Sequence, residues 1–508
     1  MKLNGKLLIA AATLLTLGQA GPARTEPAPS GGEPSDTSAA VIVDPMRPTP
    51  LLEKRSYIFN MTVLAHHSPG EQRNEKMNMM AVGDRRYLIQ NSRILDISDP
   101  LHPVLLSEGG WIGNHQIQVA YNDFVGKWLA ISTDMGGIQP GAAKPNRGIS
   151  VFDISDPRHP RLLSQWANYQ GSHRNYYDGG RYAYVTGSTG PEWNTNSGDM
   201  WGGSTGGLQI VDLSDPSSPK AVTSWHYPGQ LVNEIEARKT WSSANDRARM
   251  ATLHGPEYVP VRIEDGGKLG YGPWGALGMM IHDLSDPAHP KLVSRWDPDH
   301  YVSGMGGLAF HTIDIARLDR GFVITNPETF WPQCRQPYHD SYVIDVSDPA
   351  HPNQLAVMPV PKPPPDAPYR TFCDRYGRFG PHNPPHLKAP GKVALNFTCY
   401  SFFAAGLQCY DITDPRNPKI NAYFVPEQGG AHTHWEPLSG PMSETIRTVD
   451  NVFIEWDRKL IWAATDSGLY LLSSPALGKP ILTPMPVREW TLPSINKGWQ
   501  HFKPPAVN

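Results

Sequence analysis

Seven histidines recur along this chain, each roughly 30 to 40 residues upstream of a copy of one short phrase. Neutral imidazoles carry nitrogen lone pairs, which are good ligands for copper, iron, manganese or zinc. A single histidine would more simply cap a strand, but seven in register predict a transition-metal site made by some of them. The seven are His67, His115, His173, His254, His311, His382 and His434.

Seven nitrogens exceed the needs of one ion. We therefore expect three or four of these histidines to bind the metal and the others to support ligands or contact substrate. Two further histidines are substitutes within the set. His432 lies two residues before His434, so both would lie on one face of a strand, and His386 would replace His382 if the proline-rich loop around it shifts. Copper or iron is the expected metal, with manganese or zinc as alternatives.

Four glutamates near the same expected strands can orient an imidazole or accept a proton, although acidic residues near strand ends are more often solvated or paired. They are Glu236, Glu257, Glu328 and Glu436. Four other histidines lie inside D-P-x-H-P turns, where we expect them on the outer rim and away from any metal. These are His102, His159, His289 and His351. The sequence assigns no residue a catalytic role.

The phrase downstream of the histidines has the loose form I-x-D-[ILV]-[ST]-D-P-x-x-P and recurs about every 60 residues. Good copies begin at Ile94, Val151, Ile210, Ile281, Val343 and Cys409, and a degenerate copy begins at Leu469. Asp and Ser bond the following backbone and Pro fixes φ, so the phrase predicts a tight turn with no catalytic role. A period of this length indicates a repeat fold.

Each repeat holds four short β-rich runs separated by Gly, Asp and Pro turns, as one antiparallel propeller blade requires. Seven repeats predict an all-β fold, a seven-bladed β-propeller of four-stranded antiparallel blades with long loops. The expected blades cover about 58–110, 111–168, 169–228, 229–299, 300–360, 361–426 and 427–492. The first strand of each blade lines the central channel, and the seven histidines fall at or just before that strand.

The sequences IVDLSDPSSPKAVTSW and VFDISDPRHPRLLSQW resemble LVIVD repeats, a family of β-propeller units. The resemblance covers roughly residues 41–490 and implies the architecture and a frequently exported location, but no reaction. The histidines are also similar in layout to those of two metal-binding propeller families. These are the iron-containing carotenoid cleavage oxygenases and the copper-containing methanethiol oxidases of the selenium-binding-protein type. Such a layout implies a metal with an open position that activates dioxygen, peroxide or water.

We expect four regions along the chain. They are a signal peptide at 1–20, a disordered linker at 21–40, the propeller at 41–492 and a C-terminal tail at 493–508. Lys2 and Lys6 precede the apolar stretch 7–17, which is the pattern of an export signal. Residues 41–54 look like the end of another repeat, and we expect them to close the ring by pairing with the last blade. An eight-bladed ring that uses this segment is the alternative.

The four cysteines are interpretable because export places the chain in the periplasm or outside the cell, where disulfides form. Cys399 and Cys409 flank an expected hairpin turn, and Cys334 and Cys373 would form the second bridge, although four cysteines allow three pairings. The formal charge of −3 gives no case for nucleic acid, and no stretch predicts a membrane span. The sequence does not fix an oligomeric state.

Long insertions between the inner strands and the phrases carry several tryptophans, which either wall a pocket for an apolar or aromatic small molecule or pack the loops onto the blades. They are Trp193, Trp201, Trp274 and Trp331. Together these features favour an exported metal-dependent oxidoreductase, an oxidase or oxygenase, that acts on a small organic substrate. The alternatives are a non-catalytic propeller that binds protein or polysaccharide, and a metal-dependent hydrolase or lyase on the same scaffold.

Overall fold

The computed structural model describes residues 51, 53–68, 77–90, 92–109, 116–134, 148–169, 171–193, 206–241, 251–298, 308–428, 448–492 and 496–503. The chain divides into two compact units, residues 1–40 and 41–508, and only the second contains described residues. The expected signal peptide and linker therefore lie outside the described residues.

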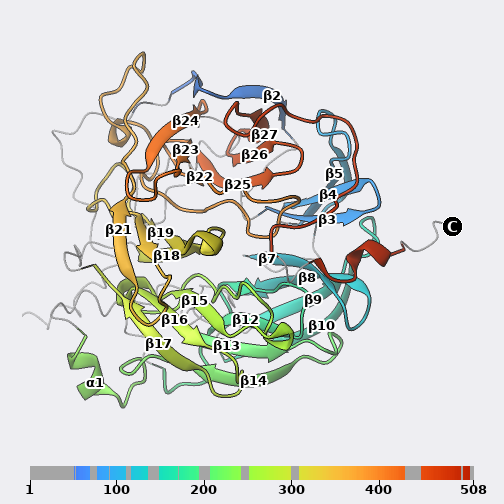
Figure 1. Cartoon of the computed structure of the whole chain (residues 1–508), viewed down its shortest axis with the longest axis vertical. Helices are drawn as coiled ribbons and strands as arrows, with labels where there is room; N and C mark the ends of the chain where they lie inside the picture. Colours follow the sequence, from blue (N-terminus) through green and yellow to red (C-terminus); the bar gives the residue numbers. More distant parts are fainter. Residues whose placement is uncertain are drawn as a thin grey trace, which may run out of the picture. The chain divides into compact units, whose positions relative to one another are not determined.

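The described strands form seven antiparallel sheets, and each sheet is one blade (Figure 1). The predicted seven-bladed propeller is therefore confirmed. The first blade holds β3 (Met77–Val82), β4 (Arg85–Gln90), β5 (Arg93–Asp96) and β6 (Val104–Ser107). The second holds β7 (Ile117–Asn122), β8 (Lys127–Asp134), β9 (Gly148–Asp153) and β10 (Arg161–Ala167). The third holds β11 (Asn175–Tyr176), β12 (Tyr182–Gly187), β13 (Gly207–Asp212) and β14 (Lys220–Trp225).

The remaining four blades follow in chain order. The fourth holds β15 (Leu269–Pro273), β16 (Met279–Asp283) and β17 (Lys291–Trp296). The fifth holds β18 (Leu308–Asp314), β19 (Phe322–Glu328), β20 (Tyr342–Asp345) and β21 (Asn353–Val357). The sixth holds β22 (Phe397–Ser401), β23 (Leu407–Asp411), β24 (Lys419–Val425) and β1 (Tyr57–Phe59). The seventh holds β25 (Val449–Glu455), β26 (Leu460–Thr465), β27 (Gly468–Ser473) and β2 (Thr62–His67).

Two blades have an irregular segment where the innermost strand belongs. In the fourth blade, Tyr258 exchanges two backbone hydrogen bonds of 3.0 Å with Tyr271 of β15. In the sixth, the N–H of His382 donates to the carbonyl oxygen of Ser401 in β22 over 2.9 Å. β15 and β22 are therefore second strands, and β1 is an additional outer strand of the sixth blade.

The ring is closed by β2, which pairs with β27 from Thr62 opposite Ser473 to His67 opposite Leu469. This strand supplies the outer position of the last blade and covers an edge that would otherwise be unpaired. The closing strand differs from the expected segment 41–54, of which only residues 51, 53 and 54 are described. The first blade accordingly begins at β3 and not near residue 58, because the chain completes two other blades before it.

The repeated phrase forms the same turn after the third strand of each of six blades. In the first blade the Asp96 carboxylate accepts the N–H of Ser98 over 3.0 Å. The same contact is made by the carboxylates of Asp153, Asp212, Asp283, Asp345 and Asp411. In an antiparallel blade the first and third strands run in the same direction, so both end on the same face of the ring. The turns after the third strands therefore lie on the face opposite to the one where the first strands begin.

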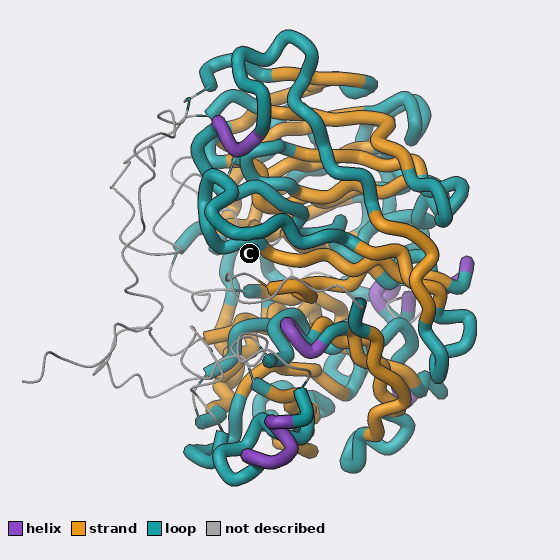
Figure 2. The backbone as a smooth tube through the Cα atoms, turned by 90° about the vertical axis from the view of Figure 1, so that its left-hand side faces the viewer, coloured by secondary structure: helices purple, strands orange, loops and turns teal. Residues whose placement is uncertain are grey.

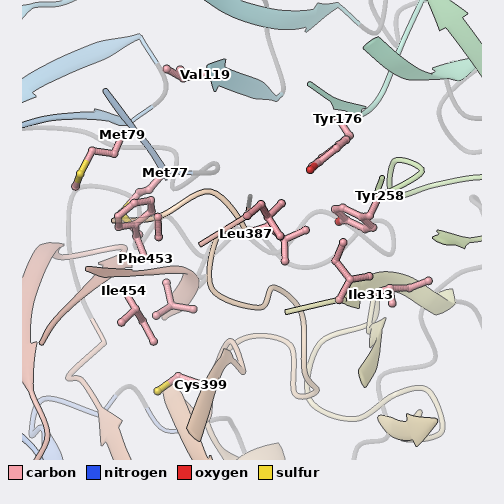
Figure 3. Packing of buried hydrophobic residues seen from close by; sticks show 14 of the residues in the cluster. Met77, Met79, Val119, Tyr176, Tyr258, Ile313, Leu387, Cys399, Phe453 and Ile454 are labelled. Atoms are coloured by element: carbon pink, nitrogen blue, oxygen red, sulfur yellow. The ribbon is translucent and has the colours of Figure 1, made fainter. Parts of the chain in front are cut away.

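Side chains fill the middle of the channel (Figure 3). Leu387 lies there among Met77, Tyr176, Tyr258 and Phe453, which come from four different blades. Met77, Tyr176, Tyr258 and Leu387 line a cavity of about 20 Å³, which is room for about one water molecule. Among the described residues, these side chains therefore block the channel at this level and separate its two ends.

Helices are short pieces between strands (Figure 2). Among the described residues they are α1 (Ile235–Lys239) and the 3-10 turns Ile263–Asp265, Gly275–Leu277, Leu318–Arg320, Phe372–Asp374 and Trp499–His501. In the part of the chain that the structure describes, no helix has the length and apolar character needed to cross a membrane.

Both expected disulfides are formed. Cys334 is bonded to Cys373, which ties two long loops together, and Cys399 is bonded to Cys409 directly across the β22–β23 pair. Disulfides persist in oxidising compartments and are rare in the cytosol. The two bridges therefore indicate that the protein works in an oxidising environment.

Candidate metal centre

Four of the seven predicted histidines lie together at one end of the channel, and we call His173, His254, His311 and His382 the histidine cluster. They come from the third, fourth, fifth and sixth blades, and none is more than 3% exposed. Neighbouring ring centroids are 4.1, 4.9 and 4.6 Å apart along this series. One position of four successive repeats thus supplies an arc of buried imidazoles.

Hydrogen bonds between blades fix the backbone of two of these histidines. The Thr133 hydroxyl, on β8 of the second blade, donates to the carbonyl oxygen of His173 over 3.1 Å. The Thr312 hydroxyl, on β18 of the fifth blade, donates to the carbonyl oxygen of His382 over 3.0 Å. Each bond joins the backbone of a histidine to the preceding blade. The packing of neighbouring blades therefore fixes the position of the Cα atom from which the imidazole projects.

A close contact and a bulge place the other two. A Cβ atom at Gly255 would lie 2.2 Å from the carbonyl oxygen of His311, so glycine is required after His254 for the fourth and fifth blades to approach. The β18–β19 register shifts between Leu308 and Thr312, so His311 lies in an irregular, bulge-like stretch of that pairing. Bulges re-aim side chains and are frequent beside functional sites.

Glu328, at the end of β19, lies at the centre of the histidine cluster and is 5% exposed. Its Oε2 is 3.5 Å from Nε2 of His254 and 3.3 Å from Nε2 of His311, and its Oε1 is 3.5 Å from Nε2 of His382. Ligand atoms of His254, His311 and Glu328 all lie within 4.8 Å of one another. Two imidazoles and one carboxylate are therefore close enough to share one ion.

The separations between these donor atoms match the edges of a metal coordination shell. With metal–nitrogen distances near 2.1 Å, neighbouring ligand atoms lie about 3.0 Å apart in an octahedron and about 3.4 Å apart in a tetrahedron. Nε2 of His173 and Nε2 of His254 are 2.9 Å apart. Two nitrogen lone pairs repel at that distance, so a proton or a cation must lie between them.

Two neighbours contact Nδ1 of His382, namely Oδ1 of Asp450 at 2.9 Å and the amide nitrogen Nδ2 of Asn383 at 2.8 Å. When Nδ1 carries the proton and donates it to Asp450, the Nε2 lone pair faces Glu328 and can bind a metal. Burial lowers the pKa of His382, and the charges of Asp450 and Glu328 only partly oppose this effect. The imidazole is therefore held in the neutral form that a metal needs.

Two buried arginines border the histidine cluster. Arg378 donates to Oε1 of Glu328 over 2.9 Å, and its guanidinium lies 4.0 Å from the ring centroid of Phe403. The Phe403 ring stacks on His382 in turn, at 4.6 Å. Arg174 follows His173 in the chain and places Nη2 3.0 Å from Nε2 of His311. The site therefore combines metal-type donors with two fixed positive charges.

Neither His67 nor His386, the other two predicted histidines that the structure describes, belongs to the cluster. His115, His432 and His434 lie outside the described residues. His67 is on β2, the outer strand of the seventh blade, and therefore lies away from the channel axis. His386 is described but lines the channel cavity, 6.1 Å from the ring centroid of Phe453.

The other predicted glutamates have different surroundings. Glu236 on α1 has an 85% exposed side chain and pairs with Lys239. Glu257 is buried and lies 2.8 Å from Nδ1 of His282 inside the fourth blade. Glu436 lies outside the described residues. Of the four, only Glu328 is described as part of the site.

The predicted tryptophans show packing roles where they are described. Trp274 is fully buried and lies edge-on to Trp225, with ring centroids 5.1 Å apart. Trp193 packs edge-on to His226 at 5.7 Å, and Trp331 is half-buried. Trp201 lies outside the described residues. The contacts of Trp274 and Trp193 are those of side chains that hold loops on the blades.

The histidines of the D-P-x-H-P turns behave as expected. The side chains of His102, His159, His289 and His351 are 78 to 83% exposed. Each places Nδ1 within 2.9 Å of the aspartate three residues earlier. They lie at the turn end of the blades and supply no ligand to the cluster.

Sequence reasoning did not identify Arg174, Arg378 or Asp450 as part of the site. Arg174 had a local signal, since it directly follows His173 in the segment GSHRNY. Arg378 and Asp450 had none, because they reach the cluster from a long insertion and from the next blade.

Comparison with known proteins supports the fold. Residues 203–226, 275–297 and 341–356 match the LVIVD repeat family. Among solved structures, the chain is similar to Raptor of Chaetomium thermophilum, with a TM-score of 0.45, 9% identity and coverage of 82% of this chain and 29% of that one. It is also similar to U3-55K, with a TM-score of 0.44, 7% identity and coverage of 82% and 98%. The chain thus spans under a third of that Raptor chain, and curated proteins gave no match.

Proposed function

Because this chain is a seven-bladed β-propeller with LVIVD repeats, and three blades direct a histidine at one buried glutamate, we propose that it is a metal-dependent oxidoreductase. His254, His311 and Glu328 would hold the metal, with His173 and His382 as further ligands. The substrate would be a small organic molecule. The ion would supply redox chemistry at a position that the protein leaves open.

The observation that carries this proposal is the spacing of the donor atoms. Nε2 of His311 and Oε2 of Glu328 are 3.3 Å apart, and Nε2 of His173 and Nε2 of His254 are 2.9 Å apart. When the Nε2 atoms carry no proton, they and the Glu328 carboxylate are acceptors directed at one another, and acceptors at such distances repel. A shared cation relieves that repulsion.

The donor types favour iron. Two imidazoles and one carboxylate are the usual protein ligands of non-haem iron(II) oxygenases, and a carboxylate oxygen is a poor ligand for copper(I). We therefore propose iron first and copper second. Zinc would indicate hydrolytic or lyase chemistry on the same residues.

Export of the protein is part of the proposal. The two disulfides fit an oxidising compartment, and the sequence from Lys2 to Ala20 has the pattern of a cleaved signal peptide. Metal loading would then take place in the periplasm or outside the cell.

Metal analysis after anaerobic reconstitution tests the proposal. Purified protein is stripped with a chelator, offered iron(II), copper, manganese or zinc separately, desalted and measured by elemental analysis. We expect about one iron per chain. We also expect nitric oxide to give the electron paramagnetic resonance signal of a ferrous nitrosyl complex, which requires an open position.

Matched variants localise the metal. His311→Ala should lose most of the iron, whereas His159→Ala in an exposed turn should keep it. Equal occupancy in the two variants, or no transition metal in the wild type under any of the four conditions, would contradict the proposal and favour a non-catalytic binding propeller.

A further inference from the structure

Arg174 is a buried cation whose hydrogen bonds are incomplete. The residue is 3% exposed, and its Nη2 lies 3.0 Å from Nε2 of His311. Its Nε and Nη1 have no hydrogen-bond partner among the described residues. A buried charged donor without a partner is costly, so these groups are expected to receive one when the protein is in its working state.

Arg378 provides the contrast within the same site. It donates to Oε1 of Glu328 over 2.9 Å and to the carbonyl oxygen of Thr329 over 3.1 Å. Its guanidinium also stacks on Phe403. The chain itself therefore holds Arg378 in place, whereas among the described residues the Arg174 guanidinium has one hydrogen bond, to His311.

A metal in the site would remove that contact as well. His311 has one lone pair on Nε2, and an ion bound there uses it, so Nη2 of Arg174 loses its acceptor. Metal binding thus leaves a guanidinium fork beside the ion with no acceptor supplied by the described residues. Such a fork has the geometry that matches a carboxylate, which accepts two parallel N–H bonds.

The charge of the site leads to the same ligand. Among the described residues, Glu328 and Asp450 carry two negative charges and Arg174 and Arg378 carry two positive charges, while the histidines are taken as neutral. A divalent ion therefore leaves the buried site with an excess of two positive charges. An anionic ligand offsets this excess in a medium of low dielectric constant.

We propose that the substrate carries a carboxylate, which binds the guanidinium of Arg174 while the substrate lies against the metal. This inference rests on the proposed function, because it needs an ion at His311. The distances allow it: with a metal–nitrogen distance near 2.1 Å, Nη2 of Arg174 lies no more than about 5 Å from the ion. One small carboxylate spans that gap.

The test uses full-length protein loaded with cobalt(II), whose visible absorption changes when an anion enters its surroundings. Acetate and oxalate are the probes, acetamide is the uncharged match for acetate, and inorganic phosphate is the alternative oxyanion. We expect acetate and oxalate to bind the cobalt protein but not the metal-free protein, and acetamide not to bind. Phosphate binding more tightly than either carboxylate would overturn the assignment.

Variants isolate the role of the guanidinium. Arg174→Gln should weaken acetate binding about 10- to 100-fold, as expected for loss of a charged pair of hydrogen bonds, while cobalt affinity stays within about threefold. Arg174→Lys keeps the charge but not the fork and should show a smaller loss. It also carries the test if the glutamine variant does not fold.

Arg158→Gln, an exposed arginine on the turn face, is the control and should bind acetate as the wild type does. Acetate affinity that is unchanged in both Arg174 variants would overturn the inference and leave the metal site intact. A wild type that binds no cobalt would instead remove the proposed function, so the two failures are distinguishable.

Discussion

Buried charged groups lie at both ends of the channel, but they are compensated differently at the two ends. At the histidine end, the histidine cluster surrounds Glu328 with donor atoms that repel one another unless a cation or proton intervenes. At the other end, which we call the lysine end, the cations belong to the chain. There the Lys388 ammonium donates to the Tyr177 carbonyl oxygen, next to Asp178.

Arg262 completes the lysine end. It donates to Oδ2 of Asp123 over 2.5 Å and to the carbonyl oxygen of Asp178 over 2.6 Å, and its Nε is 3.4 Å from Oδ1 of Asp178. Burial lowers the pKa of Lys388 to about 7 and raises the pKa of Asp178. The third, fourth and sixth blades therefore contribute both to a self-neutralised plug at one end and to an ion-accepting cluster at the other.

The largest expected effect separates stability from metal binding. Arg262→Met removes one partner of a buried ion pair and leaves Lys388 as the cation beside Asp178, which should lower the free energy of unfolding by about 3–5 kcal/mol. Iron occupancy should not change, because the lysine end supplies no ligand. Denaturant unfolding and elemental analysis of the same sample check both statements, and a parallel loss of iron would show that the two ends are coupled.

The next effect belongs to the histidine end. At a metal concentration 100 times the dissociation constant, binding stabilises the folded state by about 2.7 kcal/mol. Glu328→Gln should abolish this stabilisation, because it removes the carboxylate that three imidazoles face. Thermal unfolding with iron or with chelator measures the difference.

Glu236→Gln, with its exposed side chain, is the control and should keep the full thermal response to iron. If Glu328→Gln keeps it too, the carboxylate is not a ligand and the donor set must be revised.

A third prediction concerns pH at the lysine end. In the unfolded chain Lys388 has a pKa near 10.4, and in the folded protein its pKa is about 7, so the unfolded state binds more protons between these values. The free energy of unfolding should therefore rise with pH above 7, with a slope of at most about 1.4 kcal/mol per pH unit. We expect a rise of about 1–2 kcal/mol between pH 7 and 9.

Lys388→Met should lack that rise, as urea titrations at pH 7, 8 and 9 would reveal. A variant with the same pH profile as the wild type would mean that Lys388 stays protonated over this range, paired with Asp178.

The smallest effect is expected outside both ends. His159→Ala breaks a contact of 2.8 Å with Asp156 in which the imidazole is 80% exposed, and such surface pairs contribute at most about 1 kcal/mol. Unfolding free energy and iron occupancy should both be near those of the wild type. A large loss of either would show that the turn face contributes to the site.

The fold could be predicted because its signal is local and repeated. Each Asp of the phrase bonds the N–H two residues later, so a turn is encoded within a few residues and seven copies specify the blades. The pairing of Cys399 with Cys409 was equally accessible, since a hairpin places them opposite each other.

The site could be predicted only in part, because spacing along the chain does not determine strand position. His67 has the same distance to its phrase as His254, yet it lies on an outer strand, since the chain completes the seventh blade before it starts the first. Asp450 and Arg378 reach the cluster through contacts between blades, which depend on ring curvature and on a long insertion. No local pattern encodes those contacts.

The pairing of β2 with β27 also has consequences for how the protein is made. His66 bonds the carbonyl oxygen of Ser467, 401 residues later in the chain, so β2 is synthesised long before its partner exists. Until then it is an unpaired edge, the kind of surface on which β-proteins associate wrongly. Closure over such a sequence distance is slow, and we expect it to be the last step of folding. A chain arrested before β27 would therefore aggregate even if its first blades were intact.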